Sequence, residues 1–267
     1  MACPVGRPFI FLTLERVVFK ECFVVPLLPG LSVPEHMLGL TPGSVYVFSG
    51  SLDLDTQALA VCKSVLSDDE RVRADRFKFE KDQNHFVAAR GILRHLLGVY
   101  SQLLPDELQF VYAEKGKPEL ANGPHGLRFN VSHSHGIGAW AFVFHRRIGV
   151  DVEWTGRRVD VDSVGKRFFS EREWATLSDL SENERAHSFF LCWTRKEAFV
   201  KALGDGISFS LQAFDVSVQG EAKLTRVEGE EDPLSWTMHA FEPVETYVGA
   251  VAFDGKAEVL HHVISIS

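Results

Sequence analysis

Two carboxylates share one face of a predicted β-strand near the middle of the chain. The segment 148–154 reads Ile-Gly-Val-Asp-Val-Glu-Trp. Because successive side chains of a strand point to opposite faces, Asp151 and Glu153 lie on the same face, roughly 7 Å apart. Carboxylates this close repel each other unless a positive group lies between them, and Mg²⁺ prefers oxygen ligands and keeps positions for phosphate oxygens. The spacing indicates a Mg²⁺ site, although the exposed face of an ordinary strand would give the same pattern.

A third carboxylate lies on a predicted helix further along the chain. In the segment 193–201, which reads Trp-Thr-Arg-Lys-Glu-Ala-Phe-Val-Lys, Trp193, Glu197 and Lys201 recur every four positions and follow one side of the helix. Glu197 and Lys201 are neighbours on this side. They are candidates for chemistry, and equally for an exposed ion pair that stabilises a helix by only about 0.2–0.5 kcal/mol.

Possible phosphate-binding groups come from two other parts of the chain. The segment 130–134, Asn-Val-Ser-His-Ser, presents Ser132 and His133 as hydrogen-bond donors at the end of a strand, which suits phosphate oxygens but also an ordinary surface turn. Basic side chains surround the first predicted helix and a glycine turn after it; they are Arg71, Arg73, Arg76, Lys78, Lys81, Lys115 and Lys117. Acidic residues are interspersed among them, so a solvated charged surface remains an alternative.

Composition limits the classes of protein that fit. The chain has 267 residues, 45% of them hydrophobic, and a formal net charge of −8. Nucleic acid is an unfavourable partner for such an acidic chain, and anions bind only where basic residues converge locally. No apolar run approaches the roughly 18–20 residues that cross a bilayer, so we expect a cytoplasmic protein without membrane attachment. The four cysteines show no paired spacing that would indicate a zinc site or a disulfide framework.

Capping signals and hydrophobic periods predict the elements that must position these residues. Ser67 and Glu70, Ser170 and Glu173, and Ser181 and Glu184 have the spacing of capping boxes at helix starts. Long helices are expected over 82–100 and from 181 to 203, the second ended by Gly204. Strands are expected over 44–48, 108–112, 127–132, 139–144 and 147–154, with four or five more between 209 and 264.

The order of these elements repeats in the two halves of the chain. Each half runs through a strand, a capped helix, a long helix and further strands. We therefore predict an α+β fold of two pseudo-symmetric, similar subdomains, 43–146 and 147–267. Residues 1–42, rich in proline and glycine, are expected to form a poorly ordered N-terminal extension.

Taken together, the motifs resemble the signature of the 4′-phosphopantetheinyl transferase superfamily. The series comprises Lys115-Gly-Lys-Pro118, Phe129-Asn-Val-Ser-His-Ser134, Gly149-Val-Asp151-x-Glu153 and Trp193-Thr-x-Lys-Glu197-x-x-x-Lys201, preceded by Arg76-Phe and Ala89-Arg-Gly-Ile-Leu-Arg94. The upstream members are similar to those of the larger, surfactin-synthetase-activating (Sfp) type. The resemblance covers residues 43 to 265 with the motifs in order.

The resemblance implies a monomeric enzyme that transfers 4′-phosphopantetheine from coenzyme A to a serine of an apo acyl or peptidyl carrier protein, with Mg²⁺ as cofactor. It also implies that the active site lies in the cleft between the two similar subdomains. It implies that Asp151, Glu153 and Glu197 bind the metal and that Asp151 also borders coenzyme A. Glu197 would deprotonate the carrier serine, and Lys201 would contact the pyrophosphate.

The resemblance also assigns residues to the rest of coenzyme A. Ser132 and His133 match a phosphate-binding pair, and Lys117 matches a lysine that borders the nucleotide. Arg73 and Lys81 match basic positions close to the 3′-phosphate. The chain departs from some members at Glu70 and His85, which stand where those members carry a basic residue. The carrier is expected to dock over 160–185, where Lys166, Arg167, Phe168 and Phe169 are plausible contacts. The two phenylalanines fit the hydrophobic core equally well.

Two other hypotheses use the same residues. A Mg²⁺-dependent nucleotide phosphohydrolase would employ the carboxylates with water as the nucleophile and would need no protein acceptor. A non-catalytic coenzyme A-binding module would need no metal and would tolerate the loss of Glu197. Only the transferase hypothesis predicts that a carrier protein gains the mass of phosphopantetheine.

Overall fold

The computed structural model describes residues 11–13, 16–19, 23–204, 209–229 and 231–266. Its α-helices are α1 (Thr56–Ser64), α2 (Asp68–Ala74), α3 (Glu80–Ser101), α4 (Val161–Phe168), α5 (Glu171–Ser178) and α6 (Glu182–Leu203). The strands of the first part are β1 (Phe11–Thr13), β2 (Arg16–Phe19), β3 (Phe23–Pro26), β4 (Ser44–Ser51), β5 (Phe110–Tyr112), β6 (Pro118–Leu120), β7 (Leu127–Ser134) and β8 (Ile137–Phe144). The later strands are β9 (Ile148–Trp154), β10 (Phe214–Val216), β11 (Leu224–Val227), β12 (Trp236–Phe241), β13 (Tyr247–Asp254) and β14 (Glu258–Ile264).

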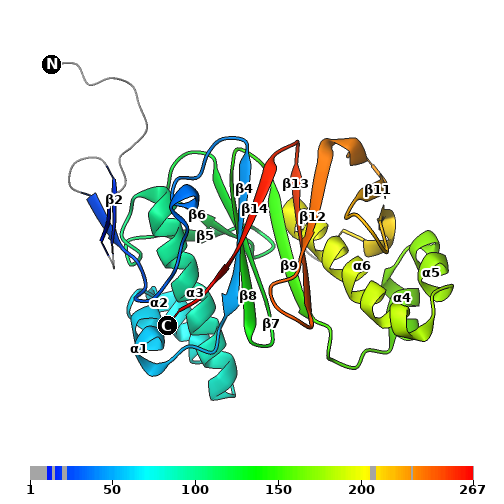
Figure 1. Cartoon of the computed structure of the whole chain (residues 1–267), viewed down its shortest axis with the longest axis horizontal. Helices are drawn as coiled ribbons and strands as arrows, with labels where there is room; N and C mark the ends of the chain where they lie inside the picture. Colours follow the sequence, from blue (N-terminus) through cyan, green and yellow to red (C-terminus); the bar gives the residue numbers. More distant parts are fainter. Residues whose placement is uncertain (1–10, 14–15, 20–22, 205–208, 230, 267) are drawn as a thin grey trace.

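Two sheets form the centre of the molecule (Figure 1). One has the strand order β14-β4-β8-β7 and the other β12-β13-β9; all neighbours are antiparallel except β14 and β4, which are parallel. Alternate residues of β4 and β8 pack in one apolar core with alternate residues of β9 and β13, including Val45, Val47, Val150 and Val251. Since the side chains of each strand alternate, the two sheets pack against each other through these faces.

A long helix covers the remaining face of each sheet (Figure 1). α3 packs on the first sheet in a core that contains Phe48 and Phe142, and α6 packs on the second in a core that contains Phe199 and Ala250. Both helices have 22 residues, and the expected ranges 82–100 and 181–203 are confirmed to within two residues. The mixed α+β class is confirmed as well.

The predicted capping interactions are borne out except at the start of one helix. Glu70 accepts a hydrogen bond from the Ser67 backbone N–H at 3.1 Å, and Ser170 and Glu173 form a reciprocal capping box. Gly204 ends α6 with φ of 80°, a left-handed conformation that glycine adopts without the usual steric cost. The capping box predicted at Ser181 is wrong, because its hydroxyl donates to the Glu184 carboxylate at 2.5 Å and makes no capping hydrogen bond to the helix backbone.

The domain division stays a prediction. Residues 1–10, 14–15 and 20–22 of the expected extension lie outside the described residues. Leu28 and Met37, from the part that is described, are both 1% exposed and pack in the core beneath α3. The last strand, β14, pairs with β4 of the first half. None of the described helices is long and apolar enough to cross a membrane.

Glu70 lies in a buried network of ion pairs with two arginines of α3. Its carboxylate is 1% exposed and accepts hydrogen bonds from the Nε of Arg90 at 2.8 Å and the Nε of Arg94 at 2.7 Å. The arginines lie on α3 and Glu70 on α2, so the buried network fastens one helix to the other. A basic side chain at position 70 would leave these arginines without an anion.

His261 makes the packing of β14 sensitive to acid. Its Nε2 lies 2.8 Å from the Ser49 hydroxyl, its ring packs against Phe241, and burial with the neighbouring His239 and His262 lowers the pKa of His261 to about 4. A histidine whose pKa is lowered by folding contributes stability that is present above its ordinary pKa and is lost as the pH falls towards 4.

We expect His261→Gln to weaken the pH dependence of stability. Between pH 7 and 5, the free energy of unfolding of the unmodified chain should fall by about 1–2 kcal/mol more than that of the variant. Urea denaturation at the two pH values measures this difference. His125→Gln, at an exposed histidine, is the control and should behave like the unmodified chain; equal pH dependence in the His261 variant would contradict the assignment.

Candidate active site

Gly149 lets helix α6 lie directly on strand β9. A Cβ atom at this position would come within 2.1 Å of the Ala198 carbonyl oxygen and 2.3 Å of the Ala202 nitrogen, so no other residue fits without moving the helix. Gly149 lies on the same face of β9 as Asp151 and Glu153, the face that looks towards α6. The close approach therefore places the last turns of α6 over the strand carboxylates.

Asp151 is buried beside a lysine and a serine. It is 5% exposed, and its Oδ1 accepts hydrogen bonds from the Ser132 hydroxyl at 2.8 Å and from the Lys201 Nζ at 2.6 Å. Lys201 also donates to the Ser132 oxygen at 2.9 Å. The other carboxylate oxygen, Oδ2, is buried and has no hydrogen-bond partner among the described residues.

Glu153 is held between a serine and an arginine. The Ser134 hydroxyl donates to its Oε2 at 2.8 Å, and the Nη2 of Arg157 donates to its Oε1 at 3.0 Å. Burial, followed by the negative charge of Asp151, raises the pKa of Glu153, while the Ser134 hydrogen bond and Arg157 oppose the rise. The two strand carboxylates are thus close enough to influence each other, as their spacing predicted.

Glu197 points into a pocket of about 430 Å³ beside α6. The pocket is also lined by Lys201, Val200, Phe168 and the segment 209–212. Burial, then Asp151, then Glu153 raises the pKa of Glu197, and Lys201 lowers it. A half-buried carboxylate with a raised pKa at the wall of a pocket is suited to accepting a proton.

The three carboxylates are near one another, but their present positions are not those of metal ligands. Within the described ranges, no group of three or more His, Cys, Asp and Glu side chains could hold a metal ion. The ammonium of Lys201 forms an ion pair with Asp151, and the guanidinium of Arg157 forms an ion pair with one oxygen of Glu153. The assignment of Asp151, Glu153 and Glu197 to a metal therefore stays a prediction, with side-chain cations paired to the two strand carboxylates in this structure.

The residues nevertheless fit a divalent cation. The buried Asp151 Oδ2 lacks a partner, and a buried carboxylate oxygen without one is costly. Burial, and after it repulsion among the carboxylates, raises the pKa values of Glu153 and Glu197, and added positive charge would relieve this repulsion. All three donors are carboxylates, the ligand type that Mg²⁺ prefers.

Positive groups gather at the end of β7, next to Asp151. His133 is accessible to solvent at this end. Desolvation by the surrounding protein, followed by the positive charges of Lys201, His85 and Arg73, lowers the pKa of its imidazole. The acidic residues that offset this charge are Asp53, which lies 2.8 Å from His85, and Asp151, which opposes the lowering of the His133 pKa. An anion at this position would be favoured by several charges at once.

Lys117 does not present its ammonium to the solvent. Its Nζ donates to the carbonyl oxygens of Ile148 at 2.9 Å, Lys201 at 2.6 Å and Ala202 at 3.5 Å, and burial lowers its pKa to about 8. The lysine thus joins the β5–β6 turn to the start of β9 and the end of α6. Its predicted place beside a nucleotide stays a prediction.

Comparison with known families accounts for both halves of the chain. The profile described as "4′-phosphopantetheinyl transferase, N-terminal" matches residues 55–143, and that of the 4′-phosphopantetheinyl transferase superfamily matches residues 147–252. The 4′-phosphopantetheinyl transferase HetI of Nostoc sp. is 36% identical over 222 residues, which cover 82% of this chain and 91% of that relative. The chain belongs to the 4′-phosphopantetheinyl transferase superfamily.

Other members of the superfamily support the larger type. The 4′-phosphopantetheinyl transferase psf-1 of Bacillus pumilus is 32% identical over 186 residues, or 68% of this chain and 76% of that relative. The transferase Sfp of Bacillus subtilis is 29% identical over 164 residues, or 61% and 70% of the two chains. The predicted membership and Sfp type are confirmed, and the chain is a 4′-phosphopantetheinyl transferase enzyme.

Arg73 and Lys81, the basic residues that this transferase is predicted to use for the 3′-phosphate of coenzyme A, line different surface hollows. Arg73 lies on α2 beside Arg76, Phe77 and Tyr112. Lys81, at the start of α3, lies in a second hollow beside Asp53. Of the two, Arg73 is the one whose charge acts on His133. Both assignments remain predictions.

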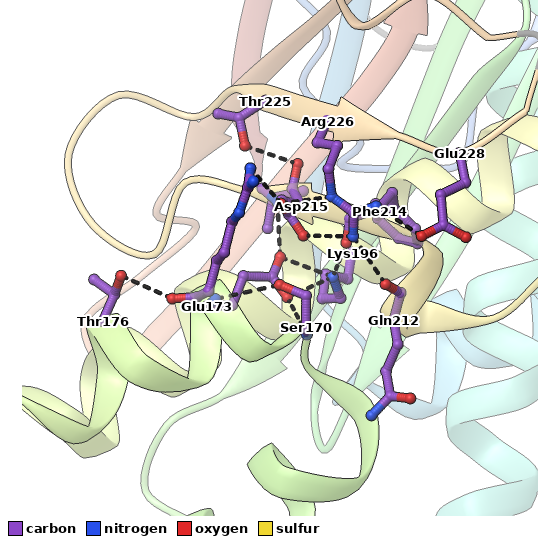
Figure 2. A network of polar contacts seen from close by, with 12 residues as sticks. Ser170, Glu173, Thr176, Lys196, Gln212, Phe214, Asp215, Thr225, Arg226 and Glu228 are labelled. Atoms are coloured by element: carbon purple, nitrogen blue, oxygen red, sulfur yellow. Dashed lines mark hydrogen bonds and ion pairs between the residues drawn. The ribbon is translucent and has the colours of Figure 1, made fainter.

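The neighbour of Glu197 on α6 has a role that the sequence did not reveal. Lys196 is 0% exposed and donates to both carboxylate oxygens of Glu173 and to the Phe214 carbonyl, each at 2.7 Å (Figure 2). Glu173 also accepts from the Val216 backbone N–H at 2.7 Å. The ion pair binds α6 to α5 and β10, and so fixes which way the next residue, Glu197, faces in this phosphopantetheinyl transferase.

The sequence prediction did not include the contact of Ser134 with Glu153 and gave Ser134 only as a neighbour of His133. Its contact with Glu153 could have been found from the pattern of β7, where Asn130, Ser132 and Ser134 are polar at alternate positions. Such a row on one face of a buried strand predicts polar partners on the element opposite. Arg157 gave no comparable signal, because it follows β9 in a loop.

Proposed function

We propose that this enzyme transfers the 4′-phosphopantetheine of coenzyme A to a serine hydroxyl of an apo acyl or peptidyl carrier protein, leaving adenosine 3′,5′-bisphosphate. The observation that carries the proposal is that Glu197 and Lys201 line one pocket, that Lys201 is bonded to Asp151, and that the charges of Asp151 and Lys201 act on Glu197. In the reaction, the serine oxygen forms a bond to the β-phosphorus of coenzyme A. The bond from this phosphorus to the oxygen shared with the α-phosphate breaks.

Asp151, Glu153 and Glu197 would hold Mg²⁺, which would offset negative charge on the pyrophosphate oxygens. Glu197 also accepts the proton of the attacking serine. Its raised pKa brings it closer to the pH at which a carboxylate works as a base, and its position in the pocket leaves it accessible to an incoming hydroxyl. The protein otherwise contributes positioning and charge, as is usual for phosphoryl transfer.

Lys201 stabilises the leaving phosphate. An ammonium group has three N–H donors, and two of these go to Asp151 and Ser132, so the third can bind a phosphate oxygen. Its contact with Asp151 holds the charge in place before substrate arrives. His133, with Ser132 next to it, would bind a further phosphate at the end of β7.

The acceptor protein is proposed to dock where α4 meets the pocket. Arg167 and Phe168 line the pocket mouth and are available to an acidic carrier domain. Phe169, expected as another contact, is 1% exposed and lies in the core beneath α6. A monomeric state, a cytoplasmic location and the division at residue 146 remain predictions of the sequence.

A single assay tests the proposed function. The protein is incubated with coenzyme A, Mg²⁺ and an apo carrier protein, and the carrier is weighed by mass spectrometry. We expect the carrier to gain one phosphopantetheine, and its serine-to-alanine variant to gain none. Breakdown of coenzyme A without any change in the carrier would favour a phosphohydrolase, and binding without turnover would favour a non-catalytic module.

Lys201→Ala should reduce kcat about 10²-fold with a smaller effect on KM, because the lost charge acts mainly on the phosphate as it leaves. Steady-state kinetics with varied coenzyme A measures both constants. Lys63→Ala, which removes an exposed lysine on α1, is the matched control and should match the unmodified enzyme. A higher KM with unchanged kcat would contradict this role.

A further inference from the structure

A row of polar side chains joins the edges of the two sheets. β7 ends the first sheet and β9 ends the second, and among the described residues no strand pairing joins them. Asn130, Ser132 and Ser134 occupy alternate positions of β7 and so point the same way. They are 6%, 8% and 8% exposed, and buried polar groups of this kind need partners.

Each member of the row has its partner on β9. The Asn130 Oδ1 accepts from the Val150 backbone N–H at 2.9 Å. The Ser132 hydroxyl donates to Asp151, and the Ser134 hydroxyl donates to Glu153, both at 2.8 Å. These side chains take the place of a backbone ladder and fix the register of β9 against β7. Both strand carboxylates are consequently held from the same neighbouring strand.

The Ser134 hydroxyl is fixed in place because it both donates and accepts a hydrogen bond within the protein. Its oxygen accepts a hydrogen bond from the Trp154 backbone N–H at 3.2 Å while it donates to the Glu153 Oε2. Arg157 is the second partner of the Glu153 carboxylate. Its side chain is 37% exposed, and it donates to the other oxygen, Oε1. Without the serine hydroxyl, the carboxylate would retain only the arginine and would turn towards it and the solvent.

We propose that Ser134 is a positioning residue that aims Glu153 at the metal. The proposal rests on the metal site of the proposed function. Hydrogen-bond partners of metal-binding carboxylates typically change metal affinity 10- to 100-fold when they are removed. Ser134 meets this description, because its hydroxyl uses both its donor and its acceptor within the protein and is not itself placed to bind substrate.

The test measures metal binding directly. Mn²⁺ is titrated into the protein in the presence of coenzyme A and followed by calorimetry, for the unmodified chain, Ser134→Ala and Ser134→Thr. We expect Ser134→Ala to weaken Mn²⁺ binding about tenfold and Ser134→Thr, which keeps the hydroxyl, to restore it. In transfer assays, Ser134→Ala should need more Mg²⁺ for half-maximal rate but approach the normal kcat at saturation.

Ser49→Ala is the matched control, because Ser49 is also buried and its hydroxyl is hydrogen-bonded to a side chain, His261, and not to a strand carboxylate. It should lower the melting temperature without changing Mn²⁺ affinity. Mn²⁺ affinity that is unchanged in Ser134→Ala, or equally reduced in Ser134→Thr, would overturn the role of Ser134 alone. Absence of Mn²⁺ binding to the unmodified chain would overturn the metal site and, with it, this role.

Discussion

Glu197→Gln is expected to slow transfer about 10³-fold. The amide cannot accept the serine proton, and a positioned general base contributes about 10²–10⁴-fold to rate. The change also removes one of the three carboxylates proposed to hold Mg²⁺. Transfer to an apo carrier, followed by mass spectrometry over time, measures the loss.

The same substitution should leave the fold as stable as before, or more so. Burial and the charges of Asp151 and Glu153 raise the pKa of Glu197, which means that its ionised form costs folding free energy at neutral pH. The neutral amide avoids this cost. Among the described residues, Glu197 makes no hydrogen bond or ion pair that the substitution would break. Thermal unfolding should give an equal or higher melting temperature.

Glu182→Gln provides the control for charge and helix position. Glu182 is exposed in the first turn of the same helix, far along the axis from the pocket, and its replacement should leave the transfer rate unchanged. Near-normal transfer by Glu197→Gln would remove the basis for its role as the base. A lower transfer rate together with a clearly lower melting temperature would indicate that the substitution disturbs the structure instead.

Lys196→Met is expected to lower the free energy of unfolding by about 3–5 kcal/mol. Lys196 and Glu173 are 0% and 2% exposed, and removing the lysine would leave the Glu173 carboxylate buried with no cation to balance it (Figure 2). Glu173 would retain its backbone donors at Ser170 and Val216, which cannot neutralise its charge. For a chain of this size, the loss corresponds to a melting temperature lower by about 10 °C.

Denaturation with urea or heat measures this loss. Lys223→Met removes a lysine with an ion pair of similar length, 2.6 Å to Glu221, but at a site where both side chains are more than half exposed. It should change stability by no more than about 0.5 kcal/mol. Equal effects of the two substitutions would show that burial does not govern the Lys196 pair.

Much of the local structure followed from the sequence because it depends on residues close together in the chain. The alternation in 148–154 placed Ile148, Val150 and Val152 in the core between the sheets and Asp151 and Glu153 on the other face. Capping residues and hydrophobic period located both long helices. The order of the motifs was sufficient to predict the superfamily.

The sequence could not predict which charged side chains pair across the fold. Lys201 and Asp151 are 50 residues apart, and their contact depends on how closely α6 lies on β9 at Gly149. Nor could the sequence predict that Lys201 and Arg157 pair with the strand carboxylates, and the assignment of the three carboxylates to a metal stays a prediction. The sequence also gave no sign that the Lys117 ammonium donates to carbonyl groups of β9 and α6.

The sequence by itself thus determined the strand and helix faces, the three acidic residues and the family. Periodicity and capping are encoded over a few neighbouring residues, where sterics and hydrogen bonding leave few choices. The tertiary structure decided the partners of those residues, including Ser134 for Glu153 and Glu173 for Lys196. Such pairs form between distant segments, and only the packing of sheets and helices sets the distances that Coulomb and hydrogen-bond energies depend on.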